Sequence, residues 1–420
     1  MKKTLFFLIL AVSFTAPLMA AEPLTLGEAL KTADKNHPQI EDAAASLSAT
    51  EARLGQARAS YWPQINLAAD WNKGDTFLTA LGGIKETEVA TTSVVVRQNL
   101  YDFGRTAGAA AAAHGARAAA AEGLTLSRQD VAFRVKAAWH LVLAVERQVE
   151  ASRKTLAARE GLFRQAEEFF RHGIRSRVEV ARSEASLFAG KSLLSKAENN
   201  RDLARLELAN AMGLDSLADR PLAEPEANTD PTPEKLLSLR EEALLNRSEL
   251  KRLSFLKEMA TGSLRSARSG YLPTLSGTAS YGEAAQSLLP EGQVWALGVN
   301  LILPVFSGFA TQEQVREAEA AIHGVEAQQK NLRLQVAKEV AAAWLGISEA
   351  QDRLATSSKE ASAAQESQRL ATERYREGLG TMIEALDAQA QALSAETAQI
   401  QAGYDQRIAR ARLDRALGRQ

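Results

Sequence analysis

The chain has 420 residues, with 50 Lys and Arg against 51 Asp and Glu, 11 Pro and no Cys. This charge balance argues against a nucleic-acid-binding protein, which would carry a basic face, and the absence of Cys excludes a disulfide framework or a thiolate metal site. Abundant Ala, Leu, Glu, Arg and Gln, with only 6% aromatic residues, predict long helices.

The N-terminus has the pattern of a targeting segment. Lys2 and Lys3 precede a short apolar run, and Ala20 and Ala21 supply small residues for cleavage. This pattern is typical of a secretory signal peptide, which we place at residues 1–21. The apolar run is too short to cross a bilayer as a helix, which takes ~20 residues. We therefore expect an exported chain whose membrane insertion would use β-strands.

The rest of the sequence contains an internal repeat. The matching positions are Trp139 and Trp344, Phe170 and Tyr375, and Gly173 and Gly378 at a spacing of 205, and Tyr61 and Tyr271 at a spacing of 210. An ordered series of matches predicts two structural repeats. We place them at residues 22–213 and 232–420, joined by a Pro-rich linker at 214–231.

Each repeat is predicted to run helix, strand, strand, long helix, turn, helix. Residues 24–60 have a helical apolar period that ends before Pro63, where apolar and polar residues begin to alternate. The predicted strands are residues 61–72, 90–101, 271–282 and 293–304. Their length and alternation are typical of outer-membrane barrel strands, although an ordinary half-solvated antiparallel sheet would give the same pattern.

The predicted strands are too few to close a barrel within one chain, since the smallest outer-membrane barrels use about eight. An open sheet edge in lipid leaves backbone N–H and C=O groups unpaired, at several kcal/mol each. We therefore expect the chain to oligomerise. Two copies and three copies both satisfy this argument.

The long helices are predicted at about residues 103–170 and 309–375. At ~1.5 Å per residue each would span about 100 Å, roughly twice the length of the helices at 24–60 and 177–213. A heptad row typical of a coiled-coil seam comprises Val135, Val142, Val149, Leu156, Phe163 and Phe170. We expect a helical cylinder whose long helices alternate with stacked pairs of short ones.

The Ala-rich stretch 107–121 opens the first long helix. We interpret it chiefly as a strong helix former, with close helix packing below the sheet as the alternative.

Several ordered motifs together resemble one family. They are Tyr61-Trp62-Pro63, Gln98-Asn99-Leu100-Tyr101-Asp102-Phe103-Gly104, Leu303-Pro304-Val305-Phe306-Ser307-Gly308, Phe170-Arg171-His172-Gly173 and Tyr375-Arg376-Glu377-Gly378. The chain resembles the TolC-like outer-membrane efflux channels over essentially its whole mature length. The resemblance implies a mainly α fold with a membrane β-barrel portion: a homotrimer whose 12-stranded barrel continues into a 12-helix α-barrel.

The resemblance also implies a location and a function. The protein would sit in the outer-membrane lipid of a Gram-negative bacterium with a long periplasmic extension. It would be the exit channel of a tripartite efflux or type I secretion system, working with a periplasmic adaptor and an inner-membrane transporter. No nucleic acid and no cofactor are expected.

The turns at Gly173 and Gly378 are expected at the periplasmic mouth. Beyond the second turn, Glu384 and Asp387 are three residues apart and share a helix face, so copies converging on an axis would form an acidic, cation-favouring ring. The resemblance places the aperture-lining acidic residues at these two positions.

The resemblance further assigns a gate-network tyrosine to Tyr375 and its acidic partner to Glu179. It also expects an arginine where this chain has Gly380. Arg175 or Arg177 from the first turn could substitute for that arginine.

The tips of the two turns resemble the family's adaptor-contacting segments. They are His172-Gly173-Ile174 and Glu377-Gly378-Leu379. The alternative is an ordinary helix C-cap with its hydrophobic contact.

An enzyme is not expected. The His residues lack metal-ligand spacing, and we find neither a Gly-rich phosphate loop nor a nucleophile elbow. The competing function is a periplasmic coiled-coil scaffold or adaptor, which leaves the duplicated alternating hairpins unexplained. The sequence does not identify the cargo.

Overall fold

A computed structural model of the chain describes residues 22–78, 83–217, 220–224, 235–285 and 292–419. The predicted signal peptide and half of the predicted linker lie outside these residues. The chain is mainly helical with one small antiparallel sheet, which confirms the predicted fold class. No described helix is both long and apolar enough to cross a membrane.

The two halves of the chain have the same order of elements. The first half contains α1 (Leu26–Asn36), α2 (Pro38–Ala59), β1 (Gln64–Leu78), β2 (Gly83–Tyr101), α3 (Arg105–Arg171) and α4 (Arg177–Ala211). The second contains α5 (Leu236–Asn246), α6 (Ser248–Arg268), β3 (Thr274–Ala285), β4 (Gly292–Ile302), α7 (Ala310–Arg376) and α8 (Met382–Leu417). The long helices α3 and α7 have 67 residues each, about 100 Å of helix.

The first helical region differs from its prediction, because residues 24–60 form two helices. Pro38 takes the first position of α2, where its missing N–H costs nothing, and His37 caps that helix by accepting the Gln39 N–H at its Nδ1, 3.1 Å away. The break directs α1 onto α3, where it joins the largest core.

The first hairpin is also longer than predicted. Beyond Trp71 the apolar alternation stops, so the local pattern predicts no strand there. The pairing continues, with Lys73 opposite Glu88 in the register and an ion pair between them at 3.2 Å. Cross-strand charge pairing extends the ladder where the hydrophobic pattern ends.

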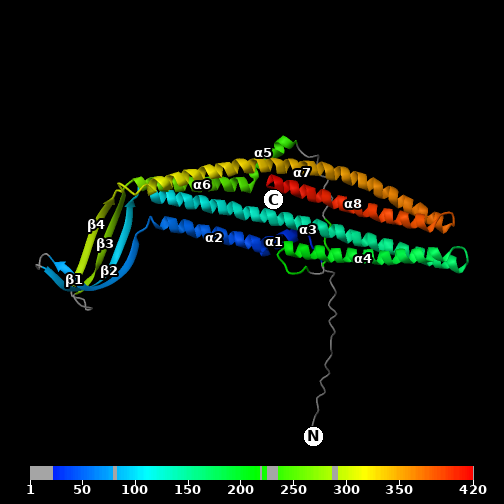
Figure 1. Cartoon of the computed structure of the whole chain (residues 1–420), viewed down its shortest axis with the longest axis horizontal. Coiled ribbons are helices and arrows are strands. Elements are labelled where there is room, and N and C mark those ends of the chain that lie inside the picture. The colour runs from blue at the N-terminus through cyan, green and yellow to red at the C-terminus, as the bar shows by residue number, and fades with distance from the viewer. Residues whose placement is uncertain (1–21, 79–82, 218–219, 225–234, 286–291, 420) are drawn as a thin grey trace, which may run out of the picture.

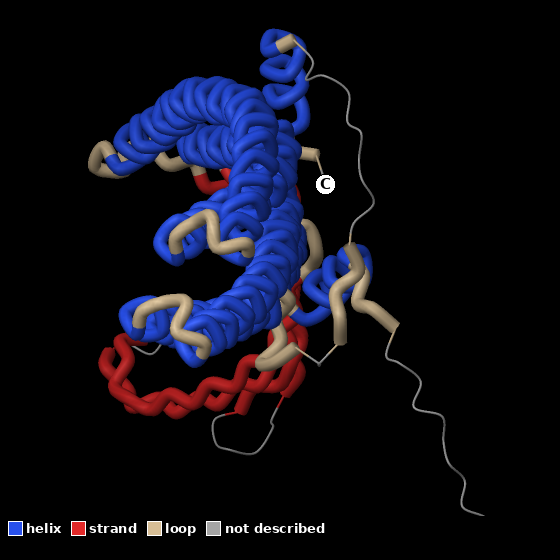
Figure 2. The backbone as a smooth tube through the Cα atoms, turned by 90° about the vertical axis from the view of Figure 1, so that its right-hand side faces the viewer, coloured by secondary structure: helices blue, strands red, loops and turns tan. Residues whose placement is uncertain are grey.

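The molecule is an elongated, curved wall. The sheet lies at one end, and the helices run away from it to the two turns at the other end (Figure 1). Viewed from the turn end, the helices form an open arc and the sheet is curved (Figure 2). The sheet order is β1-β2-β3-β4, so β1 and β4 are open edges within the described chain.

The predicted heptad row is buried as a seam over only part of its length. Val135, Val142 and Val149 are buried around the fully buried Trp139. Toward the turn end the seam loosens, and Phe170 is exposed.

The Ala-rich stretch of α3 is a close helix contact, so the interpretation as a mere helix former was wrong. A Cβ on Gly108 would lie 2.6 Å from the Ser266 backbone nitrogen, and one on Gly262 would lie 2.4 Å from that of Ala112. Backbones this close leave no room for side chains. The contact joins α3 to α6 just below the sheet and so fixes the first half of the chain to the second.

Candidate functional site

The two predicted tips end long helices in the same way. Gly173 and Gly378 have φ values of +71° and +80°, a conformation that favours glycine. The Ile174 N–H donates to the Phe169 carbonyl at 2.9 Å, and the Leu379 N–H donates to the Arg374 carbonyl at 2.8 Å. These bonds satisfy the last carbonyls of α3 and α7.

The tip side chains point to solvent. The exposed residues are His172, Gly173, Ile174, Glu377, Gly378 and Leu379. Ile174 and Leu379 are therefore not covered by the hydrophobic contact that usually accompanies such a cap. The turns have the ordinary cap geometry and also leave two apolar side chains free at the end of the molecule.

Arg175 connects the first turn to the second. Its Nη2 donates to the carbonyl oxygens of Gly378 at 3.2 Å and Gly380 at 3.1 Å. Its other terminal nitrogen lies 3.6 Å from the Glu179 carboxylate, and its guanidinium lies 5.8 Å from the Tyr375 ring centre. Of the two arginines that could replace the missing one, Arg175 therefore makes the cross-turn contacts.

Tyr375 lies under this arginine and is fully buried. Its hydroxyl donates to Glu179 Oε2 at 3.2 Å, and its ring belongs to a core with Leu162 and Met382. Burial first, and then the nearby Glu179 carboxylate, raise the pKa of the Tyr375 phenol above its ordinary value. The predicted pair of Tyr375 and Glu179 is thus in contact.

Gly380 occupies a space that a side chain would not easily enter. A Cβ there would lie 3.1 Å from the Arg374 Cβ and 3.2 Å from the Tyr375 backbone nitrogen. The close turn against α7 favours glycine at this position.

Glu384 and Asp387 are both exposed near the start of α8. Glu384 also caps that helix: its N–H donates to Thr381 Oγ1 at 3.2 Å, and its carboxylate accepts the Thr381 N–H at 3.3 Å. The Thr-x-x-Glu spacing could have shown this capping box in the sequence. Only Asp387 of the two is without a capping role.

The sheet has one exposed apolar face. Residues directly opposite in the register share a face, and they place large apolar side chains together from all four strands. The exposed members are Ile65, Leu67, Trp71, Val94, Tyr281, Trp295, Leu297, Val299 and Leu301. The opposite face carries polar side chains such as Asn66, Asp70, Arg97 and Ser280.

Aromatic side chains also gather where the sheet joins the helices, a feature that the sequence analysis missed. The exposed ones are Tyr61, Trp62, Tyr101, Phe103, Tyr271, Phe306 and Phe309. They lie at strand ends and helix starts, where aromatic residues flank the apolar band of outer-membrane strands. Their positions next to predicted strand ends would have been the signal.

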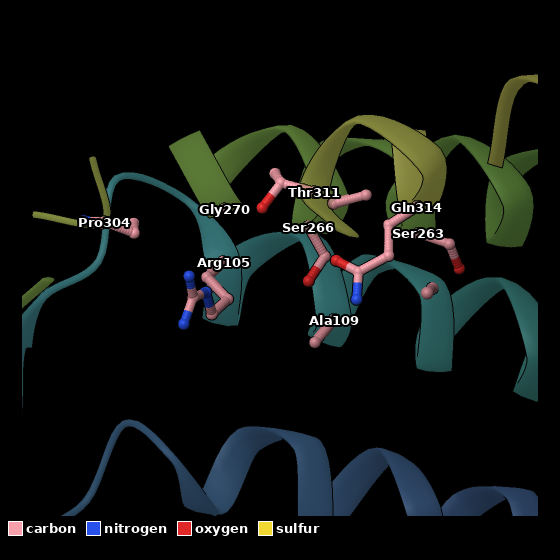
Figure 3. Close-up of a pocket in the computed structure, with 10 residues that line it drawn as sticks. Arg105, Ala109, Ser263, Ser266, Gly270, Pro304, Thr311 and Gln314 are labelled. Carbon is pink, nitrogen blue, oxygen red and sulfur yellow. The ribbon is translucent and has the colours of Figure 1, made fainter. Parts of the chain in front are cut away.

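A pocket of about 710 Å³ lies below this aromatic band, between the starts of α3 and α7 and the end of α6 (Figure 3). Its lining is small and polar, with Ser263, Ser266 and Gln314, and with Arg105 as its one charged residue. In the described part of the chain no group of His, Asp or Glu is arranged to hold a metal ion.

Comparison with known proteins gives a consistent result. The model of the family described as outer membrane efflux protein matches residues 29–214 and 239–419. Outer membrane efflux protein BepC of Brucella suis is 25% identical, over 95% of this chain and 86% of that protein. Outer membrane protein TolC of Vibrio cholerae is also 25% identical, over 94% of this chain and 90% of that protein.

A solved structure has the same fold. The outer membrane protein VceC of Vibrio cholerae superposes with a TM-score of 0.81 at 20% identity, covering 94% of this chain and 96% of that one.

Proposed function

Because the chain belongs to the outer membrane efflux protein family, we propose that three copies of it close one channel, with a 12-stranded β-barrel followed by a 12-helix α-barrel. The protein is an outer-membrane exit channel of an efflux or secretion system, in the Gram-negative cell envelope. The family match leaves no support for a periplasmic scaffold or adaptor.

The observation that carries the proposed assembly is the sheet. Its exposed apolar face would be covered by lipid, and its polar face would line the channel. Its two open edges would cost several kcal/mol for each unpaired backbone group in lipid, and neighbouring copies would remove this cost. The aromatic band then lies at the level of the lipid headgroups, on the side of the helices.

The far end of the helices would be the periplasmic mouth. We propose that Glu384 and Asp387 line it and favour cations, and that Tyr375 and Glu179 belong to the network that keeps it narrow. In this chain Arg175 supplies the cation of that network, through the Gly378 and Gly380 carbonyls.

The exposed tips would dock a periplasmic adaptor, which in turn would connect the channel to an inner-membrane transporter. Ile174 and Leu379 present apolar contacts at the end of the molecule, beside turns that glycine makes tight. Apolar residues in a polar surrounding are common at the centre of protein interfaces.

Planar-bilayer conductance of the detergent-purified mature protein tests this proposal. We expect small, cation-preferring openings and a trimeric mass by light scattering corrected for detergent. A protein that stays soluble without detergent and never inserts would contradict the membrane assembly. Insertion as a monomer or dimer would contradict the threefold closure alone.

A further inference from the structure

The two halves of the chain are equivalent closely enough to predict how copies meet. The helices α3 and α7 have equal lengths and start 205 residues apart. The two hairpins also share a register: Ile65 opposite Val96 in the first corresponds to Leu275 opposite Leu301 in the second. A contact between the first and second halves of one chain should therefore recur between copies. There the second half of one copy would meet the first half of the next.

The open edge of the helical wall shows that this counterpart is needed. Leu345 on α7 is 61% exposed, whereas its equivalent His140 on α3 is 7% exposed, against α8. Leu206 on α4 is 55% exposed, whereas its equivalent Ala411 on α8 is 9% exposed. Helices α3 and α8 pack against each other within the chain. Their equivalents α7 and α4 have no such contact in the described chain, and their apolar residues are exposed there.

From these observations, and resting on the proposed assembly of copies, we propose a residue-level junction between them. Strand β4 of one copy pairs with β1 of the next with Asn300 opposite Asp70 and Leu301 opposite Ala69. Helix α7 lies against the neighbour's α2, with Glu317 facing Arg53. The junction thus uses an ion pair where the chain's own α3–α6 contact uses glycines.

The strand register follows from the β2–β3 pairing within the chain. There Val95 lies opposite Ser280 and Val96 lies opposite Ala279. A spacing of 205 residues relates β2 to β4, and a spacing of 210 relates β1 to β3. These spacings turn the two pairs into the proposed ones. The result also puts the apolar Leu301 beside Ala69 and the polar Asn300 beside Asp70. A slip by one residue would mix the two faces of the sheet.

The helix pair follows from the α3–α6 contact. Ala112 and Ser263 both line the pocket between these helices, and their equivalents are Glu317 and Arg53. Both are exposed in the isolated chain. Opposite charges at matching positions of the two open edges are complementary, as expected for partners.

The junction between copies is wider than the contact within the chain. Gly108 and Gly115, which meet the α6 backbone, correspond to Glu313 and Ala320 on α7. A Cβ at Gly115 would lie 2.6 Å from the Met259 nitrogen, so side chains at these positions require more space between the helices.

Disulfide trapping tests the register, and the natural absence of Cys means that no thiol has to be removed. The double variants D70C/N300C and A69C/L301C are oxidised in detergent and run under denaturing conditions. Adjacent pairs alternate between the two antiparallel pairing types, so at least one has the closer Cα approach. We expect a covalent ladder up to the closed oligomer.

The matched controls are D70C/G298C and A69C/V299C, each two residues out of register, where diagonal Cα distances of about 7–8 Å disfavour a disulfide. Stronger trapping of these controls would overturn the register. No trapping by any variant in a protein that is still trimeric and conducting would overturn the junction and leave the proposed function standing. A protein that neither assembles nor conducts would refute the proposed function itself.

Charge reversal tests the ion pair. R53E and E317R should each raise the monomer fraction several-fold at low salt, and the double variant R53E/E317R should restore assembly. R58E is the control, because its equivalent Arg268 pairs with Glu319 of α7 in the same chain, which places Arg58 toward its own α3. Equal effects of R58E and R53E, or no rescue by the double variant, would contradict the pair.

Discussion

The first turns of α3 and α7 share a backbone path but not a composition. Residues 106–121 of α3 are almost all Ala and Gly, whereas the equivalent residues 311–326 of α7 include four Glu and an Arg. Helix α3 packs against both α2 and α6 of its own chain, whereas α7 packs against α6 and has no comparable contact with α2 within the described residues. The difference shows that a repeat keeps its backbone while each side chain adapts to what covers it.

The prediction with the largest expected effect concerns His140, which is buried on α3 whereas its equivalent Leu345 is exposed on α7. Burial first, and then Arg407 and Lys136, lower the pKa of His140 to about 4. Its ring lies 6.4 Å from that of Tyr404, and its Nδ1 has no hydrogen-bond partner. The folded chain therefore favours the neutral imidazole.

Acid should weaken the fold through this residue. Since the pKa in the folded chain lies below the unfolded value of 6.5, stability present above about pH 6.5 is lost as the pH falls toward about 4. The loss would be about 3 kcal/mol, on 1.36 kcal/mol per pKa unit. Thermal unfolding of the wild type and of His140→Leu between these pH values checks it. An equally acid-sensitive His140→Leu would contradict the assignment.

Gly262 tests the close contact of the first half with the second. We expect Gly262→Ala to destabilise the chain by about 1–3 kcal/mol, because its Cβ would overlap the Ala112 backbone. Gly123→Ala is the matched control: nothing lies near its Cβ, and an Ala in a helix interior should stabilise by about 0.5–1 kcal/mol. Chemical denaturation measures both. A tolerated Gly262→Ala would mean that the helices separate without cost.

The elements of this fold were predictable where one physical signal dominates. Alternation located β3 and β4, and the apolar seam located α3 through Val135 and Val142. The extension of β1 past Trp71 was not, because it depends on Lys73 meeting Glu88 across the hairpin. Pairing between residues distant in sequence leaves no local pattern.

The site divides in the same way. The turns at Gly173 and Gly378 were predictable because a left-handed residue at a helix end favours glycine. The choice of Arg175 over Arg177 was not, because it depends on which side chain reaches carbonyls of the opposite turn. The aromatic band was missed because its members come from four separate segments.

A variant of Arg175 tests the difference between the two turns. The first turn supplies the cation, and the second supplies only the carbonyls that it contacts. Arg175→Gln should weaken the link by about 1 kcal/mol, since its hydrogen bonds are charged but partly exposed. Single-channel recording should then show a several-fold higher open probability. Arg177→Gln, on an exposed neighbour, should leave it unchanged. Equal behaviour of the two variants would remove Arg175 from the gate.

The acidic residues beyond the second turn should produce the smallest effect. Glu384→Gln with Asp387→Asn removes both charges, and the Gln still accepts the Thr381 N–H, so the cap of α8 is kept. Reversal potentials across a salt gradient should show reduced cation preference with an unchanged unfolding temperature. Glu360→Gln, on an exposed part of α7 far from the turn, is the control. Unaltered selectivity in the double variant would mean that these carboxylates are a solvated helix face, as at most exposed acidic positions of the chain.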